Sequence, residues 1–132
     1  MSLRFDMIGL FPKDLARMVE FYKALLRVEV DWDGKSPYAE FKHEGIRFAM
    51  YARSDLPALL GKEPDYTRQI NGTFELAIDL PHFEDVEGEF ERALSLGAKQ
   101  VYAPRMEPWG MRSSMVADLE GNLVEIGSWN KG

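Results

Sequence analysis

Met115-Val-Ala-Asp-Leu-Glu-Gly-Asn-Leu-Val-Glu-Ile-Gly-Ser-Trp129 is the stretch of sequence that decides the fold. Two short apolar runs flank a central Asp-Leu-Glu-Gly-Asn segment, and because Asp, Gly and Asn favour turns, the stretch predicts a β-hairpin. After the turn the side chains alternate, so Val124 and Ile126 share one face and Glu125 projects from the other. Val124 and Ile126 are the predicted core contacts. Glu125 therefore either lines a cavity or lies on a solvated strand face.

The composition is that of a soluble globular protein, with 132 residues, 45% hydrophobic and 29% charged. The absence of cysteine excludes disulfides and thiolate metal sites. No apolar run approaches the roughly 20 residues of a membrane span, and no signal-peptide pattern is present, so we expect a cytoplasmic protein without a membrane partner. The net charge of −6 argues against a nucleic-acid partner and permits a cationic ligand.

The first half of the chain predicts the order β-α-β-β-β. Asp14 is the expected N-cap of a helix whose apolar residues recur at helical spacing. Turns at residues 34–37 and 43–45 separate the later strands. The predicted elements are a strand at 3–11, a helix at 15–26 and strands at 28–32, 38–42 and 46–51.

The second half repeats this pattern after a segment rich in Pro and Gly. A linker at 54–71 is expected to contain one helical turn at 56–60. Gly97 is the expected C-terminal cap of the second helix. The predicted elements are a strand at 73–80, a helix at 83–96, a strand at 100–103 and hairpin strands at 111–118 and 122–128.

The two halves align at a fixed offset of 68 residues, which takes Met7 to Glu75 and Asp14 to His82. A repeat that occurs only twice predicts a duplicated module: a first module at 1–53 and a second at 72–132, in one compact structural domain. Two βαβββ modules of this size cannot each bury their own apolar faces. We therefore predict an α+β fold in which curved sheets pair around a central trough, and a homodimer.

The sequence resembles the vicinal-oxygen-chelate superfamily of glyoxalases, bleomycin-resistance proteins, fosfomycin-resistance proteins and extradiol dioxygenases. The resemblance covers essentially the whole chain, and it is closest in character to the metal-free, bleomycin-resistance type. It implies paired βαβββ modules with a ligand site in the trough. Its carriers are Lys13-Asp-Leu15, Phe21-Tyr22, Leu25-Leu26, Leu96-Gly-Ala98, Pro108-Trp-Gly110 and the Asp118–Ile126 stretch.

The resemblance implies that metal-dependent members bind their ion through four side chains. At only one of these four positions does this chain have the residue that the family usually has. Glu125 matches the final Glu, whereas Met7 and Glu75 stand where the family usually has His. The fourth ligand should fall within residues 48–51, which are Phe, Ala, Met and Tyr, and from this range we name Met50. Thioether and apolar side chains are poor ligands for a hard divalent ion, so we expect neither a metal nor another cofactor.

Several residues remain as candidates to bind a ligand, while no catalytic residue is assigned. Glu75 and Glu125 either form an acid/base pair or are neutralised by arginines such as Arg47 or Arg112. Trp109 lies in a loop that enters the closing hairpin, where it either stacks on a planar ligand or anchors the loop. The predicted ligand-binding residues are Glu75, Glu125, Met7, Met50, Trp109 and Arg112.

Three functions stay open on the sequence alone. The first is a metal-free protein that sequesters a planar, cationic small molecule in the trough between the modules. The second is a lyase, isomerase or dioxygenase that has a degenerate or atypical divalent-metal site. The third is a regulatory module whose trough is filled by its own methionines. The preferred prediction is the first.

Overall fold

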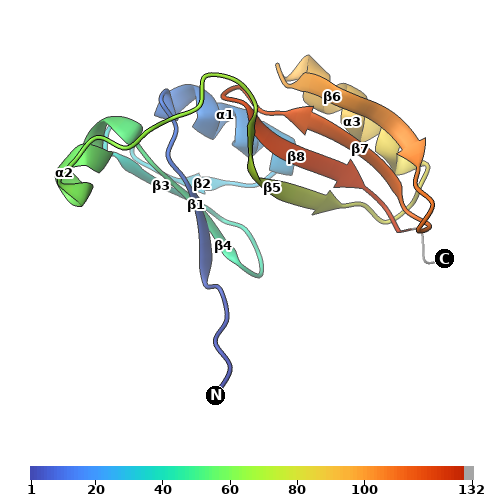
Figure 1. Cartoon of the computed structure of the whole chain (residues 1–132), viewed down its shortest axis with the longest axis horizontal. Coiled ribbons are helices and arrows are strands. Elements are labelled where there is room, and N and C mark those ends of the chain that lie inside the picture. Colours follow the sequence, from blue (N-terminus) through green and yellow to red (C-terminus); the bar gives the residue numbers. More distant parts are fainter. Residues whose placement is uncertain (130–132) are drawn as a thin grey trace. The chain divides into compact units, whose positions relative to one another are not determined.

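The computed structural model describes residues 1–129, and the chain forms two compact units that divide after Tyr66. Each unit contains a four-stranded mixed sheet built in the order β-α-β-β-β (Figure 1). The α+β class and the two-module architecture predicted from the sequence are confirmed. Within the described residues no helix is long and apolar enough to cross a membrane.

The sheet of the first unit has the strand order β1-β4-β3-β2. Strand β1 runs parallel to β4, and the remaining neighbours are antiparallel. A short 3₁₀ helix (Arg53–Asp55) and helix α2 (Leu56–Leu60) follow the sheet, and α2 confirms the helical turn predicted in the linker. The sheet elements are β1 (Met7–Leu10), α1 (Leu15–Leu26), β2 (Val30–Asp31), β3 (Tyr38–Phe41) and β4 (Arg47–Tyr51).

Helix α1 forms where the sequence predicted it. The Asp14 side chain accepts a hydrogen bond from the Arg17 backbone N–H at 3.2 Å, which satisfies one of the free donors of the first turn. The apolar stripe of the helix is buried, and the Tyr22 ring meets Phe48 of β4 at 5.3 Å between centroids. Phe48 in turn contacts Phe41 of β3 at 4.9 Å. These aromatic contacts place the core of the first unit between α1 and one face of its sheet.

The sheet of the second unit has the strand order β5-β8-β7-β6, with β5 and β8 parallel. Helix α3 packs on one face of this sheet against β6, β7 and β8 (Figure 1). The buried helix residues Val86 and Phe90 meet a face that carries Val116 and Val124. The elements are β5 (Asn71–Asp79), α3 (Asp85–Ser95), β6 (Lys99–Met106), β7 (Arg112–Ala117) and β8 (Asn122–Gly127).

The closing hairpin β7–β8 is confirmed, and its turn is held by Asp118. The buried Asp118 carboxylate accepts hydrogen bonds from the backbone N–H groups of Glu120 and Asn122 at 2.8 and 3.0 Å. Gly121 has φ of +90°, and a Cβ at that position would collide with the backbone carbonyl oxygen of Gln69. The turn therefore requires glycine for both its conformation and its packing.

The predicted strand at 3–11 is wrong at its start, because β1 begins at Met7. Residues 7–10 pair with Arg47–Met50 of β4, and β4 itself begins at Arg47, shortly after the turn at Gly45. Residues 3–6 consequently have no neighbouring strand in their own sheet. Alternating apolar residues indicated a strand, but a strand also needs a partner.

Candidate functional site

The open face of the second sheet carries Glu125 and Glu75. Glu125 of β8 pairs with Met115 of β7 and with Ala77 of β5, so these side chains share a face. Glu75 pairs with Leu123, which places it diagonally from Glu125 on the adjacent strand. The two carboxylates thus belong to neighbouring strands of one sheet. Leu76 and Ile78 of β5 pair with Val124 and Ile126 on the opposite, helix-packed face.

The surroundings of Glu125 disfavour its charged form. Partial burial raises the pKa of the Glu125 carboxyl, and the negative charges of Glu75 and Glu107 raise it further. Neither Glu75 nor Glu125 has an ion-pair partner within the described part of the chain. The site is therefore an acidic surface on which Glu75 and Glu125 form no ion pair with a cation among residues 1–129.

A polar ring lies on the same face, beside Glu125. The side chain of Glu107 is only 8% exposed, and its Oε1 accepts hydrogen bonds from Arg105 Nε at 2.6 Å and from Ser113 Oγ at 2.9 Å. The Tyr102 hydroxyl donates to Ser113 Oγ at 3.2 Å, and the Arg105 guanidinium lies 3.8 Å from the Tyr102 ring centroid. The hydrogen bonds from Arg105 and then Ser113 lower the pKa of Glu107. Glu107 is thus a fixed negative charge.

Trp109 lies in the tight turn that joins β6 to β7. The Gly110 N–H donates to the Glu107 carbonyl at 3.0 Å, and Pro108 and Trp109 form the corner between them. The Trp109 side chain is 63% exposed. The prediction that this loop enters the closing hairpin is correct, and the exposed ring stands at the same turn as Glu107, where it is available to a ligand.

The structure does not bring Arg112 to the open face of the second sheet, which carries Glu125. Arg112 forms an ion pair with Glu87 of α3, which lowers the pKa of the Glu87 carboxyl. Because side chains alternate along β7, Arg112 lies on the helix-packed side, whereas Ser113 and Met115 lie on the side of Glu125. Arg112 therefore neither neutralises Glu125 nor shares a site with it.

Met7 and Met50 lie on opposite faces of the first sheet. Met50 of β4 pairs with Leu10 and Ala39, is 1% exposed and belongs to the core beneath α1. Met7 pairs with Arg47 on the open face and is 39% exposed. The prediction that Met50 lines the same ligand site as Met7 is thereby corrected. Strand alternation places Ala49 and Tyr51, and not Met50, on the open face.

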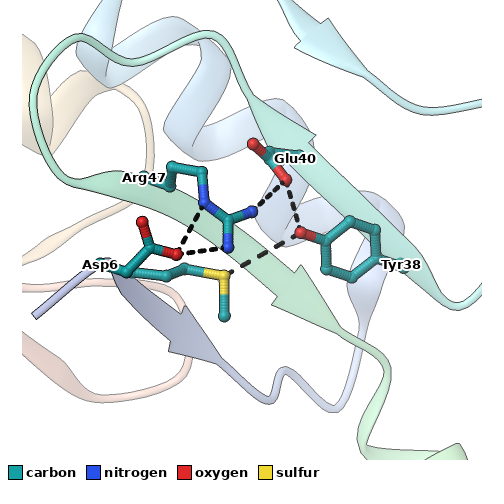
Figure 2. A network of polar contacts seen from close by, with 5 residues as sticks. Asp6, Tyr38, Glu40 and Arg47 are labelled. Carbon is teal, nitrogen blue, oxygen red and sulfur yellow. Dashed lines mark hydrogen bonds and ion pairs between the residues drawn. The ribbon is translucent and has the colours of Figure 1, made fainter.

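The open face of the first sheet carries a charged network centred on Arg47 (Figure 2). The Arg47 guanidinium donates to Asp6 Oδ2 at 2.7 Å and to Glu40 Oε1 at 3.0 Å. The Tyr38 hydroxyl donates to the same Glu40 oxygen at 2.6 Å, which raises the pKa of Tyr38, and it lies 4.0 Å from the Met7 sulfur. Arg47 is thus neutralised within its own unit.

The residues present do not fit the metal ion that the wider superfamily uses. No three His, Cys, Asp or Glu side chains among residues 1–129 stand close enough together to hold an ion. Met7 offers a thioether, and Met50 points into the core. A thioether and a side chain in the core are poor ligands for a hard divalent ion, so Met7 and Met50 do not fit the roles of the usual ligands.

The sequence did not reveal the Tyr102–Ser113–Glu107–Arg105 ring. The register of β6 against β7 shifts twice, between Gln100 and Tyr102 and again before Arg105, so simple alternation along β6 misplaces its side chains. One signal was available, because Arg105 and Glu107 are spaced two apart ahead of the Pro-Trp-Gly turn. Residues two apart in extended backbone share a face, and Glu107 directly follows the last residue of β6.

Residues 7–127 match the glyoxalase-like domain family. An uncharacterised protein of Mycobacterium bovis is 33% identical over 119 residues, which cover 86% of this chain and 76% of that protein. The structure resembles a glyoxalase-related enzyme from Fulvimarina pelagi, with a TM-score of 0.82 and 20% identity over 96% of this chain and 88% of the other. It also resembles a fosfomycin resistance protein from Listeria monocytogenes, with a TM-score of 0.72 and 20% identity over 97% and 94%. At these identities the structural likeness establishes the shared fold.

Proposed function

The chain belongs to the glyoxalase-like domain family, and from this premise we propose that it binds a planar, positively charged small molecule without a metal ion. The proposed binding surface, here called the acidic face, is the open side of the second sheet and comprises Glu75, Glu125, Glu107 and Tyr102 together with Trp109. Binding alone is the proposed activity, because the face offers charge and aromatic surface rather than a paired nucleophile and base.

The observation that carries the proposal is the uncompensated charge of Glu125. Its carboxylate is partly buried beside two other carboxylates, and it has no cationic partner in the described chain. Such a group is destabilised by burial and by repulsion, and a bound cation relieves both. The nearby arginines are already engaged, Arg105 with Glu107 and Arg112 with Glu87.

The aromatic side chains favour a flat ligand. Trp109 is exposed at the β6–β7 turn, and the Tyr102 ring belongs to the ring of contacts around Glu107. A planar cation can stack on an indole and still place its charge near a carboxylate. The proposal therefore combines stacking with ion pairing. Stacking alone would favour any planar molecule and ion pairing alone any cation, so only the two together select a planar cation.

The test is a calorimetric titration with N-methylacridinium, compared with neutral acridine, which has the same ring system. We expect the cation to bind more tightly, and Glu125→Gln to weaken its binding by about 1–2 kcal/mol, or roughly tenfold, because the lost contact is only partly buried. Glu91→Gln is the matched control, since Glu91 is an exposed carboxylate on α3, the helix that packs on the other face. That variant should leave the affinity unchanged.

Two results would contradict the proposal. Equal affinity of acridine and N-methylacridinium would show that charge plays no part in recognition. A stoichiometric divalent ion in protein purified without chelators would remove the metal-free character and favour an enzyme that has an atypical metal site.

A further inference from the structure

Three side chains on the open face of the second sheet form a chain of hydrogen bonds that ends on a carboxylate. The Tyr102 hydroxyl lies 3.2 Å from Ser113 Oγ, and Ser113 Oγ lies 2.9 Å from Glu107 Oε1. The same carboxylate oxygen accepts a hydrogen bond from Arg105 Nε at 2.6 Å, and this contact favours the charged form of Glu107. An ionised carboxylate has no proton to give, so it accepts hydrogen bonds and donates none.

The carboxylate therefore determines the direction of every hydrogen bond in the chain. Each hydroxyl group has one proton. Ser113 uses its proton on Glu107, so Tyr102 uses its own proton on Ser113. The Tyr102 oxygen keeps acceptor capacity only, and no other group among residues 1–129 donates a hydrogen bond to it. Tyr102 thus offers a ligand an acceptor and no donor.

The backbone pairing places this acceptor on the same face as Glu125. Tyr102 of β6 pairs with Met115 of β7, and Met115 pairs with Glu125 of β8, so the three residues form one row across the sheet. Ser113 is buried, whereas Tyr102 is half-buried. The Arg105 guanidinium lies over the Tyr102 ring, 3.8 Å from its centroid, and covers one face of the ring. Tyr102 therefore contributes its oxygen to a ligand rather than a free stacking surface.

We propose that Tyr102 selects, among planar cations, those that carry an N–H group on their ring system, because its oxygen accepts a hydrogen bond and has no proton to donate. The inference rests on the proposed function, since it names the class of cation that the acidic face binds. A ring N–H satisfies the Tyr102 oxygen while the positive charge lies near Glu125. An oxygen atom at the same place on the ligand sets lone pair against lone pair. The expected ligand class is a protonated nitrogen heterocycle, and quaternary or oxygen-containing cations bind more weakly.

Two dyes that share a planar tricyclic cation and its two dimethylamino groups provide the test. Acridine orange carries an N–H on its ring nitrogen near neutral pH, whereas pyronin Y has an oxygen atom at that position. Wild-type protein should bind acridine orange about tenfold more tightly in a calorimetric titration, as expected for a partly exposed hydrogen bond from a charged donor. Tyr102→Phe removes the acceptor and should bring the two affinities to within about twofold of each other.

Tyr66→Phe is the matched control, because it removes the same hydroxyl group from a residue of the first unit. The Tyr66 hydroxyl has no hydrogen-bond partner among the described residues. This variant should keep the full preference for acridine orange.

Ser113→Ala separates the direction of the hydrogen bond from the presence of the tyrosine ring. The variant keeps Tyr102 but removes the group that takes its proton, so the hydroxyl is free to donate to the oxygen of pyronin Y. The preference for acridine orange should therefore narrow, although Tyr102 is unchanged. A purely steric role for Tyr102 predicts no such effect. Circular dichroism establishes that each variant is folded, and Tyr102→Phe alone decides the question if Ser113→Ala does not fold.

The possible failures are distinguishable. Equal affinity of the two dyes for wild-type protein, with both binding more tightly than neutral acridine, would overturn the role of Tyr102 and leave the proposed function standing. A preference that is undiminished in Tyr102→Phe would also overturn it. Failure of both dyes to bind would overturn the proposed function and this inference together.

Discussion

At the scale of single residues, the raised pKa of Glu125 makes the stability of the fold depend on pH. Its folded pKa is raised by burial first and then by Glu75 and Glu107, so the folded state holds the proton more tightly than the unfolded state does. The wild-type protein consequently loses stability as the pH rises from the ordinary Glu pKa of 4.5 through the raised folded value. The charged carboxylate therefore destabilises the fold near neutral pH, and the cationic ligand proposed above would offset this cost.

Glu125→Gln should accordingly stabilise the protein near neutral pH. We expect a gain of about 0.2–1 kcal/mol in the free energy of unfolding, the range for like charges on neighbouring strands that are partly screened by solvent. The gain should fade as the pH falls and vanish below about pH 4.5, where the wild-type carboxyl is protonated in both states. Urea unfolding at pH 4 and pH 7.5 measures both effects. A variant that is less stable than wild type at pH 7.5 would contradict the electrostatic account.

Single residues mark the limit of what the sequence predicted about the site. Strand parity correctly assigned Glu125 to one face and Val124 and Ile126 to the other, because the register of β5 against β8 is regular there. Parity could not predict that Glu107 contacts Ser113 and lies beside Glu125, because its neighbours depend on the shifted register of β6 against β7. Met50 was misassigned because the family position was given only as a range of four residues, and alternation places two of those on each face.

At the scale of elements, the β7–β8 turn tests the fold most directly. Gly121 and Gly34 both have positive φ, at +90° and +83°, but only Gly121 faces a nearby backbone, that of Gln69. Gly34→Ala should incur only the conformational cost of that backbone region, about 1–2 kcal/mol. Gly121→Ala should be destabilised by about 1–3 kcal/mol more, because the added methyl group also collides with the chain that leads into β5.

Thermal or urea unfolding of the two alanine variants isolates the packing contribution, since the conformational contribution is common to both. Equal destabilisation of the two variants would show that the Gln69 backbone moves aside without cost. The comparison also tests the link between the closing hairpin and β5, because Asn71 N–H donates to the Gly121 carbonyl at 2.8 Å.

Helices and hairpins were predictable because their signals are local. The spacing of apolar residues and the Asp14 cap determined the bounds of α1, and the Asp118–Asn122 turn determined the β7–β8 hairpin. The start of β1 was not predictable, because it depends on where β4 begins, some forty residues away in the chain. Strand ends are set by the partner strand, whereas helix ends are set by neighbouring residues.

At the scale of the whole molecule, the repeat at an offset of 68 residues was sufficient to predict two βαβββ modules. The same offset relates Met7 on the open face of the first sheet to Glu75 on the open face of the second. The modules have diverged in charge on these faces. Arg47 is neutralised by Asp6 and Glu40 in the first, whereas within residues 1–129 Glu75 and Glu125 of the second have no ion-pair partner.

The net charge of −6 predicts how binding should respond to salt. A long-range attraction between the acidic chain and a cationic ligand is screened when the Debye length falls from about 30 Å at 0.01 M to about 3 Å at 1 M ionic strength. The affinity for N-methylacridinium should therefore fall steeply over this range, while that for neutral acridine stays nearly constant. Titrations of both compounds at several salt concentrations make the comparison. Parallel salt dependence of the two would argue that stacking alone drives binding.

The strand order β5-β8-β7-β6 also has a consequence for the time course of folding. The hairpin β7–β8 closes over the four residues 118–121, whereas β5 pairs with a strand that follows it by about fifty residues. Short loops close faster and at a smaller entropic cost than long ones. The hairpin is thus expected to form early. Strand β5 is expected to pair with the edge of β8 last. During that interval the edge of β8 lies open, so the acidic face is complete only once the slowest contact of its unit has formed.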